Sequence, residues 1–300
     1  MKNFESKNQV INFDNLSAGN SYGTSETIRA LSAKDKEWLA GIVDGDGNFD
    51  IRVINNKKVF KSLRITQSVR DSRILYRVKD LLKGGSIQLR GNRILIYTLS
   101  KQELTRPCLE AINGNIRIKI PGFTAACQSF DIDYIKASKI IPKNSHYLAG
   151  LIDTDGSISY NFASNRIELN IELKQNEFTS NLDFSQVIPD SVPNVLSLIK
   201  RNQSANKTFY SIRFSYSTVQ DMLPLYKYFK NHRLYSDFKF FRGMQIKRFL
   251  ELRTWHKYPT DSIEYKVFYN FIFKFFTHLN HKPFPDNLPK PLLTDNEIVH

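Results

Sequence analysis

The stretch Trp38-Leu39-Ala40-Gly41-Ile42-Val43-Asp44-Gly45-Asp46-Gly47 returns later in the chain as Tyr147-Leu148-Ala149-Gly150-Leu151-Ile152-Asp153-Thr154-Asp155-Gly156. Most paired positions are identical or exchange one apolar or aromatic residue for another of its kind. A repeat of this length is typical of a duplicated structural unit. The chain is therefore expected to fold as two related halves, each built around one copy of this motif.

Sequence on either side of each motif repeats as well. Ser32 with Asp35 precedes the first copy, and Pro142 with Asn144 and Ser145 precedes the second, which are helix-start signals. Apolar and polar residues alternate after each copy, which indicates two strands per half. The apolar positions are Phe49, Ile51 and Val53, then Leu63 and Ile65, in the first half, and Ile158, Tyr160 and Phe162, then Ile167, Leu169, Ile171 and Leu173, in the second.

The rest of each half predicts further helices and strands. In the first half we expect a helix over 71–82, strands over 86–89 and 93–99, and a helix over 124–138. In the second half we expect a helix over 192–200, strands over 208–216 and a helix over 238–254. The predicted fold class is a mixed α/β fold of the α+β type. Each half is expected to have the element order helix-strand-strand-helix-strand-strand-helix. The predicted boundaries are a flexible leader (1–30), a first half (31–140), a second half (141–257), and an aromatic helix with a tail (258–300).

Composition narrows the classes of partner. The 43 Lys and Arg residues outnumber the 29 Asp and Glu residues, which gives a net charge of +14. This excess favours a protein that binds a polyanion such as nucleic acid; the alternative is a soluble basic protein without such a partner. No apolar run reaches the about 18–20 residues that span a bilayer, so we expect no membrane segment. Cys108 and Cys127 are the only cysteines, too few for a disulfide framework or a zinc site.

The motif itself suggests a metal site. Small residues in succession let two helix backbones approach closely, so the two copies are expected to pack side by side and bring Asp46 and Asp155 together. Two neighbouring carboxylates repel, which implies a divalent cation, and oxygen ligands favour Mg²⁺. The alternative is that these acids are ordinary turn residues at the helix ends. It is disfavoured because negative charge at a helix C-terminus opposes the helix dipole. A calcium loop fails because Phe49 stands where it requires glycine.

Leu39–Gly47 and Leu148–Gly156 resemble the two signature motifs of the LAGLIDADG homing endonuclease family, of the double-motif monomeric type. The resemblance implies αββαββα halves related by a pseudo-twofold axis, a central interface of two helices, and saddle-shaped antiparallel sheets that enter the DNA major groove. It implies cleavage of both strands across the minor groove, leaving short 3′ overhangs. It also implies two or three Mg²⁺ ions in a shared active site, with Mn²⁺ able to substitute. The implied metal-binding residues are Asp46, Asp155, Gly45 and Thr154.

The same resemblance implies further active-site residues. The family places a polar residue, often glutamine, after the second strand of each half, where Gln67 and Gln175 stand here. It also places a basic residue beyond the fourth strand. Lys119 is the candidate in the first half and Lys239 in the second, where the spacing departs by about one residue. The alternatives are strand-end caps for the glutamines and solvated surface positions for the lysines.

The polar faces of the predicted strands supply candidates for reading DNA, since a two-stranded ribbon fits the major groove. A solvated strand face is the alternative for each residue. Because the halves differ outside the motifs, we expect a monomer that reads a long, non-palindromic site. The candidate DNA-binding residues are Asn48, Asp50, Arg52, Lys57, Lys58, Ser62, Arg64, Ser159, Asn161, Asn170, Glu172, Lys174 and Arg213.

Three functions compete at this point. The first is a site-specific DNA endonuclease encoded within an intron, and the second is an RNA maturase that helps its host intron to splice. The third, a DNA-binding regulator on the same fold, predicts degenerate motifs. Retention of both Asp46 and Asp155 favours cleavage. The abundance of Asn, Ile, Lys, Phe and Tyr, together with the resemblance, indicates an organellar genome, mitochondrial rather than chloroplast.

Overall fold

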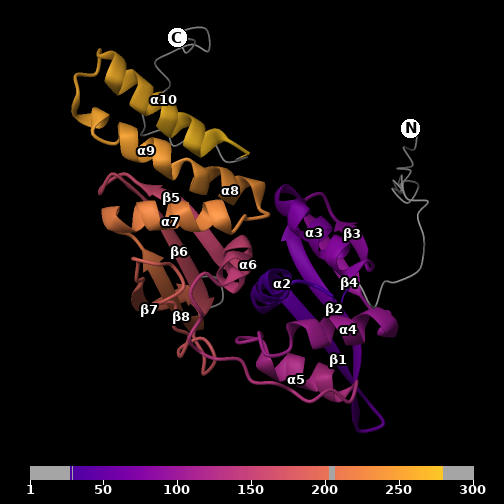
Figure 1. The fold of residues 1–300 in the computed structure, drawn as a ribbon. Coiled ribbons are helices and arrows are strands. Elements are labelled where there is room, and N and C mark those ends of the chain that lie inside the picture. The colour runs from indigo at the N-terminus through magenta and orange to yellow at the C-terminus, as the bar shows by residue number, and fades with distance from the viewer. Residues whose placement is uncertain (1–27, 29, 203–206, 280–300) are drawn as a thin grey trace, which may run out of the picture.

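Two units of similar architecture flank a central pair of helices in the computed structural model, which describes residues 28, 30–202 and 207–279 (Figure 1). The predicted leader lies almost wholly outside these residues. The first half contains α2 (Ala33–Asp46), β1 (Gly47–Ile54), β2 (Lys57–Ser68), η1 (Val69–Asp71), α3 (Ser72–Leu82), β3 (Ser86–Arg90), β4 (Ile94–Leu99), α4 (Gln102–Ile112) and α5 (Ile120–Gln128). The second contains α6 (His146–Asp155), β5 (Gly156–Asn161), β6 (Arg166–Lys174), β7 (Asn194–Asn202), β8 (Lys207–Tyr216), α7 (Val219–Asn231), α8 (Asp237–Met244) and α9 (Ile246–Leu252).

The two sheets have the same topology. Their strand orders are β1-β2-β4-β3 and β5-β6-β8-β7, and every pairing is antiparallel. Gly47 lies opposite Ile65 in the first sheet, and Gly156 lies opposite Ile171 in the second, which places the two halves on one common register. The expected mixed α and β fold with duplicated halves and antiparallel sheets is confirmed.

The motif helices α2 and α6 lie side by side at the centre of the molecule (Figure 1). Ser32 and Ser145 cap their N-termini with side-chain hydrogen bonds, as the sequence predicts. Glycine is required where the helices meet, because a Cβ atom on Gly41 would lie 2.2 Å from the carbonyl oxygen of Tyr147. A Cβ atom on Gly150 would lie 2.2 Å from the carbonyl oxygen of Trp38. The backbones therefore touch directly.

One face of each sheet covers the hydrophobic core, and the alternation of the sequence explains which face. Ile167, Leu169, Ile171 and Leu173 are all buried, whereas the residues between them are partly exposed. In the first sheet the register of β1 against β2 shifts between Asp50 and Ile51, so Lys61 is an extra residue in β2. The opposite face of each sheet carries the polar residues of the alternation, such as Asn48, Arg64 and Asn170.

Several predicted elements differ from the structure. The 192–200 stretch is not a helix. From Asn194 onward it belongs to β7, because its apolar run pairs with β8. No helix lies between β6 and β7 among the described residues, so the second half departs from the predicted element order. The 124–138 helix begins earlier, at Ile120, and ends at Gln128. The 238–254 helix breaks at Gln245 into α8 and α9, and helices α4 and α7 were not predicted.

The aromatic helix predicted within 258–300 is present. After the short helix η2 (Trp255–Lys257), α10 (Ile263–Thr277) packs on α9, where the rings of Phe249 and Phe271 lie 6.0 Å apart (Figure 1). The tail beyond residue 279 lies outside the described residues. Within the described part of the chain, every helix is too short or too polar to cross a bilayer.

Candidate active site

Asp46 and Asp155 end the two motif helices and lie next to each other across the interface. A Cβ atom on Gly45 would come within 3.0 Å of the Oδ2 atom of Asp155, so this carboxylate reaches the last turn of the opposite helix. Burial, together with the nearby charge of Asp46, raises the pKa of Asp155 to about 6, against the opposing effect of Lys239 and Lys119. Burial also raises the pKa of Asp46, against the opposing effect of Lys119 and Lys239. The structure thus brings together the two acids that the sequence singles out.

Each predicted lysine lies at the C-terminus of the motif helix in its own half. Lys119 Nζ donates to the carbonyl oxygen of Gly45 at 2.7 Å and also to that of Gly47. Lys239 Nζ donates to the carbonyl oxygens of Ile152, Asp153 and Thr154 at 2.9, 2.8 and 3.0 Å. These carbonyls form the negative end of the helix dipole, which favours the ammonium form. Burial acts in the opposite direction and lowers the pKa of both lysines. Lys239 therefore occupies the place equivalent to Lys119 despite its different spacing.

The two predicted glutamines are not equivalent. Gln67 Nε2 donates to Asp46 Oδ2 at 2.7 Å, so it orients the first-half acid. Because Gly47 opposes Ile65 and Gly156 opposes Ile171, the counterpart of Gln67 is the buried Leu173. Gln175 lies farther along, where its backbone N–H donates to the carbonyl oxygen of Tyr210. The expected match of Gln175 with Gln67 is wrong, because the sheet register differs from the count along the sequence.

Two further acids, Asp44 and Asp153, hold the lysine-bearing segments in place. Asp44 is buried and accepts the backbone N–H groups of Arg117, Ile118 and Lys119 at 2.7, 3.1 and 2.8 Å. Asp153 is likewise buried and accepts the backbone N–H groups of Tyr235 and Ser236 at 3.0 and 2.8 Å. The repeat itself carried the signal, since each motif copy contains a first acid as well as a last one.

A further contact between the halves involves Asp71 and Ser236. Asp71, in the first half, is buried and accepts a hydrogen bond from the hydroxyl of Ser236, which is fully buried at the start of α8. Beside it, Arg73 forms an ion pair with Asp237 at 2.9 Å. The first half thereby holds the end of the helix that carries Lys239. Nothing in the local sequence around Asp71 marks it for this position.

The residues predicted to read DNA mostly lie on the sheet faces opposite the core. Asn48, Arg52, Lys57, Arg64 and Lys174 are exposed there, and Asp50, Ser159, Asn161, Asn170, Glu172 and Arg213 are partly exposed. Ser62 is a correction: it opposes Asp50 on this face but is buried. Lys58 is a second correction. After the register shift it opposes Val53 and shares the core-side face of Phe60, at the exposed hairpin tip.

Charged groups on these faces are partly satisfied within the protein. Arg64 pairs with Asp50 at 2.9 Å in the first sheet, and Arg213 pairs with Glu172 at 2.8 Å in the second.

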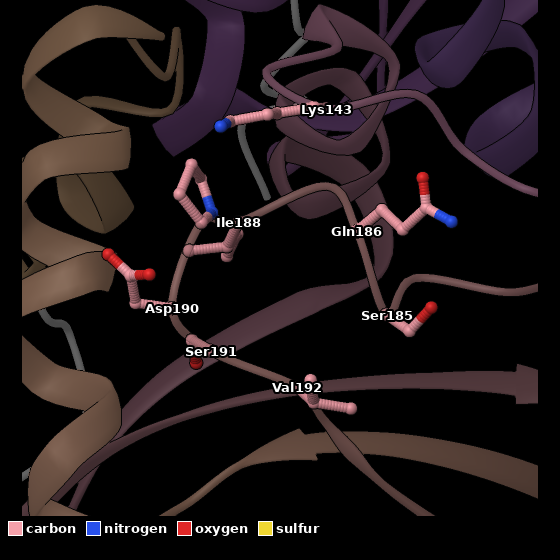
Figure 2. A pocket seen from close by; sticks show the side chains of 8 residues that line it. Lys143, Ser185, Gln186, Ile188, Asp190, Ser191 and Val192 are labelled. Atoms are coloured by element: carbon pink, nitrogen blue, oxygen red, sulfur yellow. The ribbon is translucent and has the colours of Figure 1, made fainter.

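A pocket of about 370 Å³ lies elsewhere, between Lys143 and the 185–192 segment that precedes β7 (Figure 2). None of the predicted site residues lines it, so the pocket is separate from the acids.

The acids and the carbonyls next to them fit a divalent cation. The carboxylates of Asp46 and Asp155 are hard oxygen donors, which Mg²⁺ prefers. The carbonyl oxygens of Gly45 and Thr154 each accept one hydrogen bond from a lysine and keep a second lone pair that a cation can use. Among the described residues no cluster of three or more acidic, histidine or cysteine side chains forms a closed metal cage. An open site with few protein ligands is what Mg²⁺ uses when substrate phosphates and water complete its coordination.

Comparison with known proteins agrees with this geometry. The LAGLIDADG endonuclease family matches residues 39–116 and 148–245. A Dictyostelium discoideum relative, "Intron-encoded DNA endonuclease ai2a", is 25% identical over 254 residues, which cover 84% of this chain and 78% of the relative. The Saccharomyces cerevisiae "Intron-encoded RNA maturase bI4" is 34% identical over 130 residues, or 42% of this chain; the match spans only 19% of that relative.

Solved structures share the fold. The chain resembles I-SmaMI bound to an uncleaved DNA target in the presence of calcium ions, with a TM-score of 0.52 and 13% identity over 80% of this chain and 98% of that one. A complex of I-SmaMI with an uncleavable DNA gives a TM-score of 0.51 and 14% identity over 75% and 92% of the two chains. Because both motif regions match the family and together span more than half of the sequence, the chain belongs to the LAGLIDADG endonuclease family.

Proposed function

We propose that this protein is a site-specific endonuclease that binds one long, non-palindromic DNA duplex as a monomer and hydrolyses a phosphodiester bond in each strand. The observation that carries the proposal is the pairing of Asp46 with Asp155 at the ends of two packed helices, flanked by two sheets of the same topology. One acid from each half provides one centre for each strand. Cleavage across the minor groove would leave short 3′ overhangs, as in the family.

The chain's own residues have distinct parts in this reaction. Asp46 and Asp155, with the carbonyl oxygens of Gly45 and Thr154, would hold Mg²⁺. When bound, Mg²⁺ polarises the phosphate and favours ionisation of the attacking water. Lys119 and Lys239 place positive charge beside the acids, where the phosphate's negative charge grows during attack. Gln67 fixes the orientation of the Asp46 carboxylate.

The sheet faces opposite the core would contact the major groove on either side of the cut. In the first half the exposed Arg52 and Arg64 suit guanine, and in the second half Asn170 suits adenine. The net charge of +14 supports strong, salt-sensitive contact with phosphates. Because the faces of the two halves differ in sequence, the two half-sites of the target should differ as well.

An RNA maturase is the second candidate, and the yeast maturase relative favours it. In that role the chain would bind the intron that encodes it, with or without DNA cleavage. Intron-encoded relatives also support an organellar gene, and we propose the mitochondrion rather than the chloroplast as its compartment. The retained acids make the endonuclease the preferred function.

Cleavage selection from a randomised duplex library with Mg²⁺ would identify the target. The variants Asp46→Asn and Asp155→Asn should each lose double-strand cleavage of that target yet bind it with unchanged or tighter affinity. Asp80→Asn is the matched control, because Asp80 is an exposed acid paired with Arg77 and Lys83 far along α3. Cleavage that survives in the double variant would contradict the proposal, whereas binding of intron RNA without any DNA cleavage would favour the maturase.

A further inference from the structure

The outer strand of the second sheet, β7, exposes large apolar side chains on the face opposite the core. This face, which would contact the DNA major groove, is called the groove face below. Leu196 is 49% exposed and Phe209, on the neighbouring strand, is 42% exposed, while Leu198 is partly exposed. Leu196 opposes Arg213 and Leu198 opposes Ser211, so all of these residues point away from the core residues Ile212 and Phe214. Exposed apolar side chains that are neighbours on one strand surface are typical of an interaction site.

The first half has polar residues at the same register positions. Ser86 opposes Thr98 in the first sheet, as Asn194 opposes Ser215 in the second, which aligns the outer strands β3 and β7. Gln88 is then the counterpart of Leu196, and Arg90 the counterpart of Leu198; both first-half residues are exposed. Glutamine and arginine donate hydrogen bonds to purine edges, whereas leucine has no hydrogen-bonding group.

Polar neighbours in the second sheet already bond to one another. Arg213 pairs with Glu172 at 2.8 Å, and the hydroxyl of Ser211 donates to the same carboxylate at 2.9 Å. This row lies directly beside Leu196 and Leu198. The outer part of this face therefore offers mainly apolar contact to a base edge.

Resting on the endonuclease function proposed above, we propose that Leu196, Leu198 and Phe209 read the 5-methyl groups of thymines in the outer part of the second half-site. The thymine methyl is the apolar group that normal DNA presents in the major groove, so it is the base feature that these side chains recognise. The occupant of the apolar surface is DNA because the surface continues the groove face that carries Asn170 and Lys174.

The test replaces thymine by deoxyuridine, which lacks only the methyl group. Each thymine of the duplex selected from the randomised library is replaced in turn, and binding is measured in Ca²⁺ for the wild type and for Leu196→Ala and Leu198→Ala. For the wild type we expect about a fourfold rise in Kd for each methyl removed from contact, in the outer part of one half-site. In the leucine variants the effect of deoxyuridine at those positions should disappear.

Val195→Ala is the matched control, because Val195 is similarly exposed on the same strand but opposes Phe214 on the other face. It should keep the full response to deoxyuridine. A wild-type response that is the same in Leu196→Ala and Leu198→Ala, or no response at any thymine, would overturn the thymine reading while the endonuclease function stands. Failure to select any cleaved duplex would overturn the endonuclease function and this inference with it.

Discussion

Trp38 on α2 donates a hydrogen bond from Nε1 to Asp153 Oδ2 on α6, at 3.0 Å. The reciprocal contact joins the hydroxyl of Tyr147, on α6, to Asp44 Oδ2 on α2 at 2.9 Å. The first aromatic residue of each motif thus satisfies the first acid of the other. Since these acids also hold the backbone that leads to Lys119 and Lys239, each centre is built with a contribution from the opposite half.

Trp38→Phe should therefore destabilise the protein through the acid in addition to the loss of packing that a smaller buried ring causes. The variant leaves a buried carboxylate oxygen of Asp153 with one donor fewer, which costs about 1–3 kcal/mol of unfolding free energy. Urea unfolding at neutral pH measures the change. Trp255→Phe is the control for packing, because Trp255 in η2 is partly buried against the core and is not among the hydrogen-bond partners of Asp44 or Asp153. Equal losses for the two variants would mean that the hydrogen bond contributes nothing measurable.

Gly41→Ala and Gly150→Ala should disrupt the contact between the motif helices. The added methyl group would lie 2.2 Å from a backbone carbonyl oxygen in each case, and a backbone atom cannot move aside as a flexible side chain can. We expect a loss of about 3 kcal/mol or more in unfolding free energy, together with loss of cleavage. Gly91→Ala controls for backbone strain alone, because its φ is +59° and no atom lies near its added Cβ. A Gly41→Ala variant as stable as Gly91→Ala would contradict direct helix contact.

The sequence predicted those parts of the fold that local patterns determine. Ser32 and Ser145 mark the starts of the motif helices because capping is a contact within one turn. Ile167–Leu173 alternates and is a strand. The 192–200 stretch has a short apolar run that fits a helix or a strand equally well, and only its pairing with β8 decides between them.

The candidate active site was predictable in two steps: the repeat marks Asp46 and Asp155, and the family resemblance implies Lys119 and Lys239. These four residues lie close together in the structure. The role of Asp44 depends on amide groups of residues 117–119, far along the chain, which no local pattern reports. The counterpart of Gln67 depends on which residues oppose each other in the sheet, and register is a property of pairing between strands.

The buried acid pair should make the protein less stable at neutral pH than near pH 4. The folded-state pKa of Asp155 is about 6, above its ordinary value of 3.8, so folding disfavours the ionised form. Its unfavourable contribution is absent below about pH 4 and grows as pH rises through about 6. Asp155→Asn should raise the unfolding free energy by up to about 3 kcal/mol at pH 8 in EDTA, and by little at pH 4. Urea unfolding at both pH values measures this, and a stabilisation independent of pH would contradict the charge argument.

The unlike partners of the two acids should make the centres differ in rate. Gln67 orients Asp46, while Leu173 at the corresponding position cannot donate a hydrogen bond to Asp155. Gln67→Leu should slow the cutting of one strand about 10- to 100-fold more than that of the other. The variant removes the hydrogen bond that orients the metal-binding carboxylate of Asp46 and leaves the centre of Asp155 unchanged. Supercoiled plasmid carrying the target would then accumulate as a nicked circle. Gln102→Leu, at an exposed position at the start of α4, is the control, and equal slowing of both strands by Gln67→Leu would refute the asymmetry.

Asp71→Ala should affect the second half although Asp71 belongs to the first. The variant leaves the fully buried hydroxyl of Ser236 without its acceptor at the start of α8, the helix that carries Lys239. We expect a loss of about 1–3 kcal/mol in unfolding free energy and a larger slowing of one strand's cleavage than of the other's. Ser236→Ala combined with Asp71→Ala should cost less than the sum of the single changes, because neither partner is then left unsatisfied. Strictly additive losses in urea unfolding would show that the two residues act independently and that this contact between the halves does not position α8.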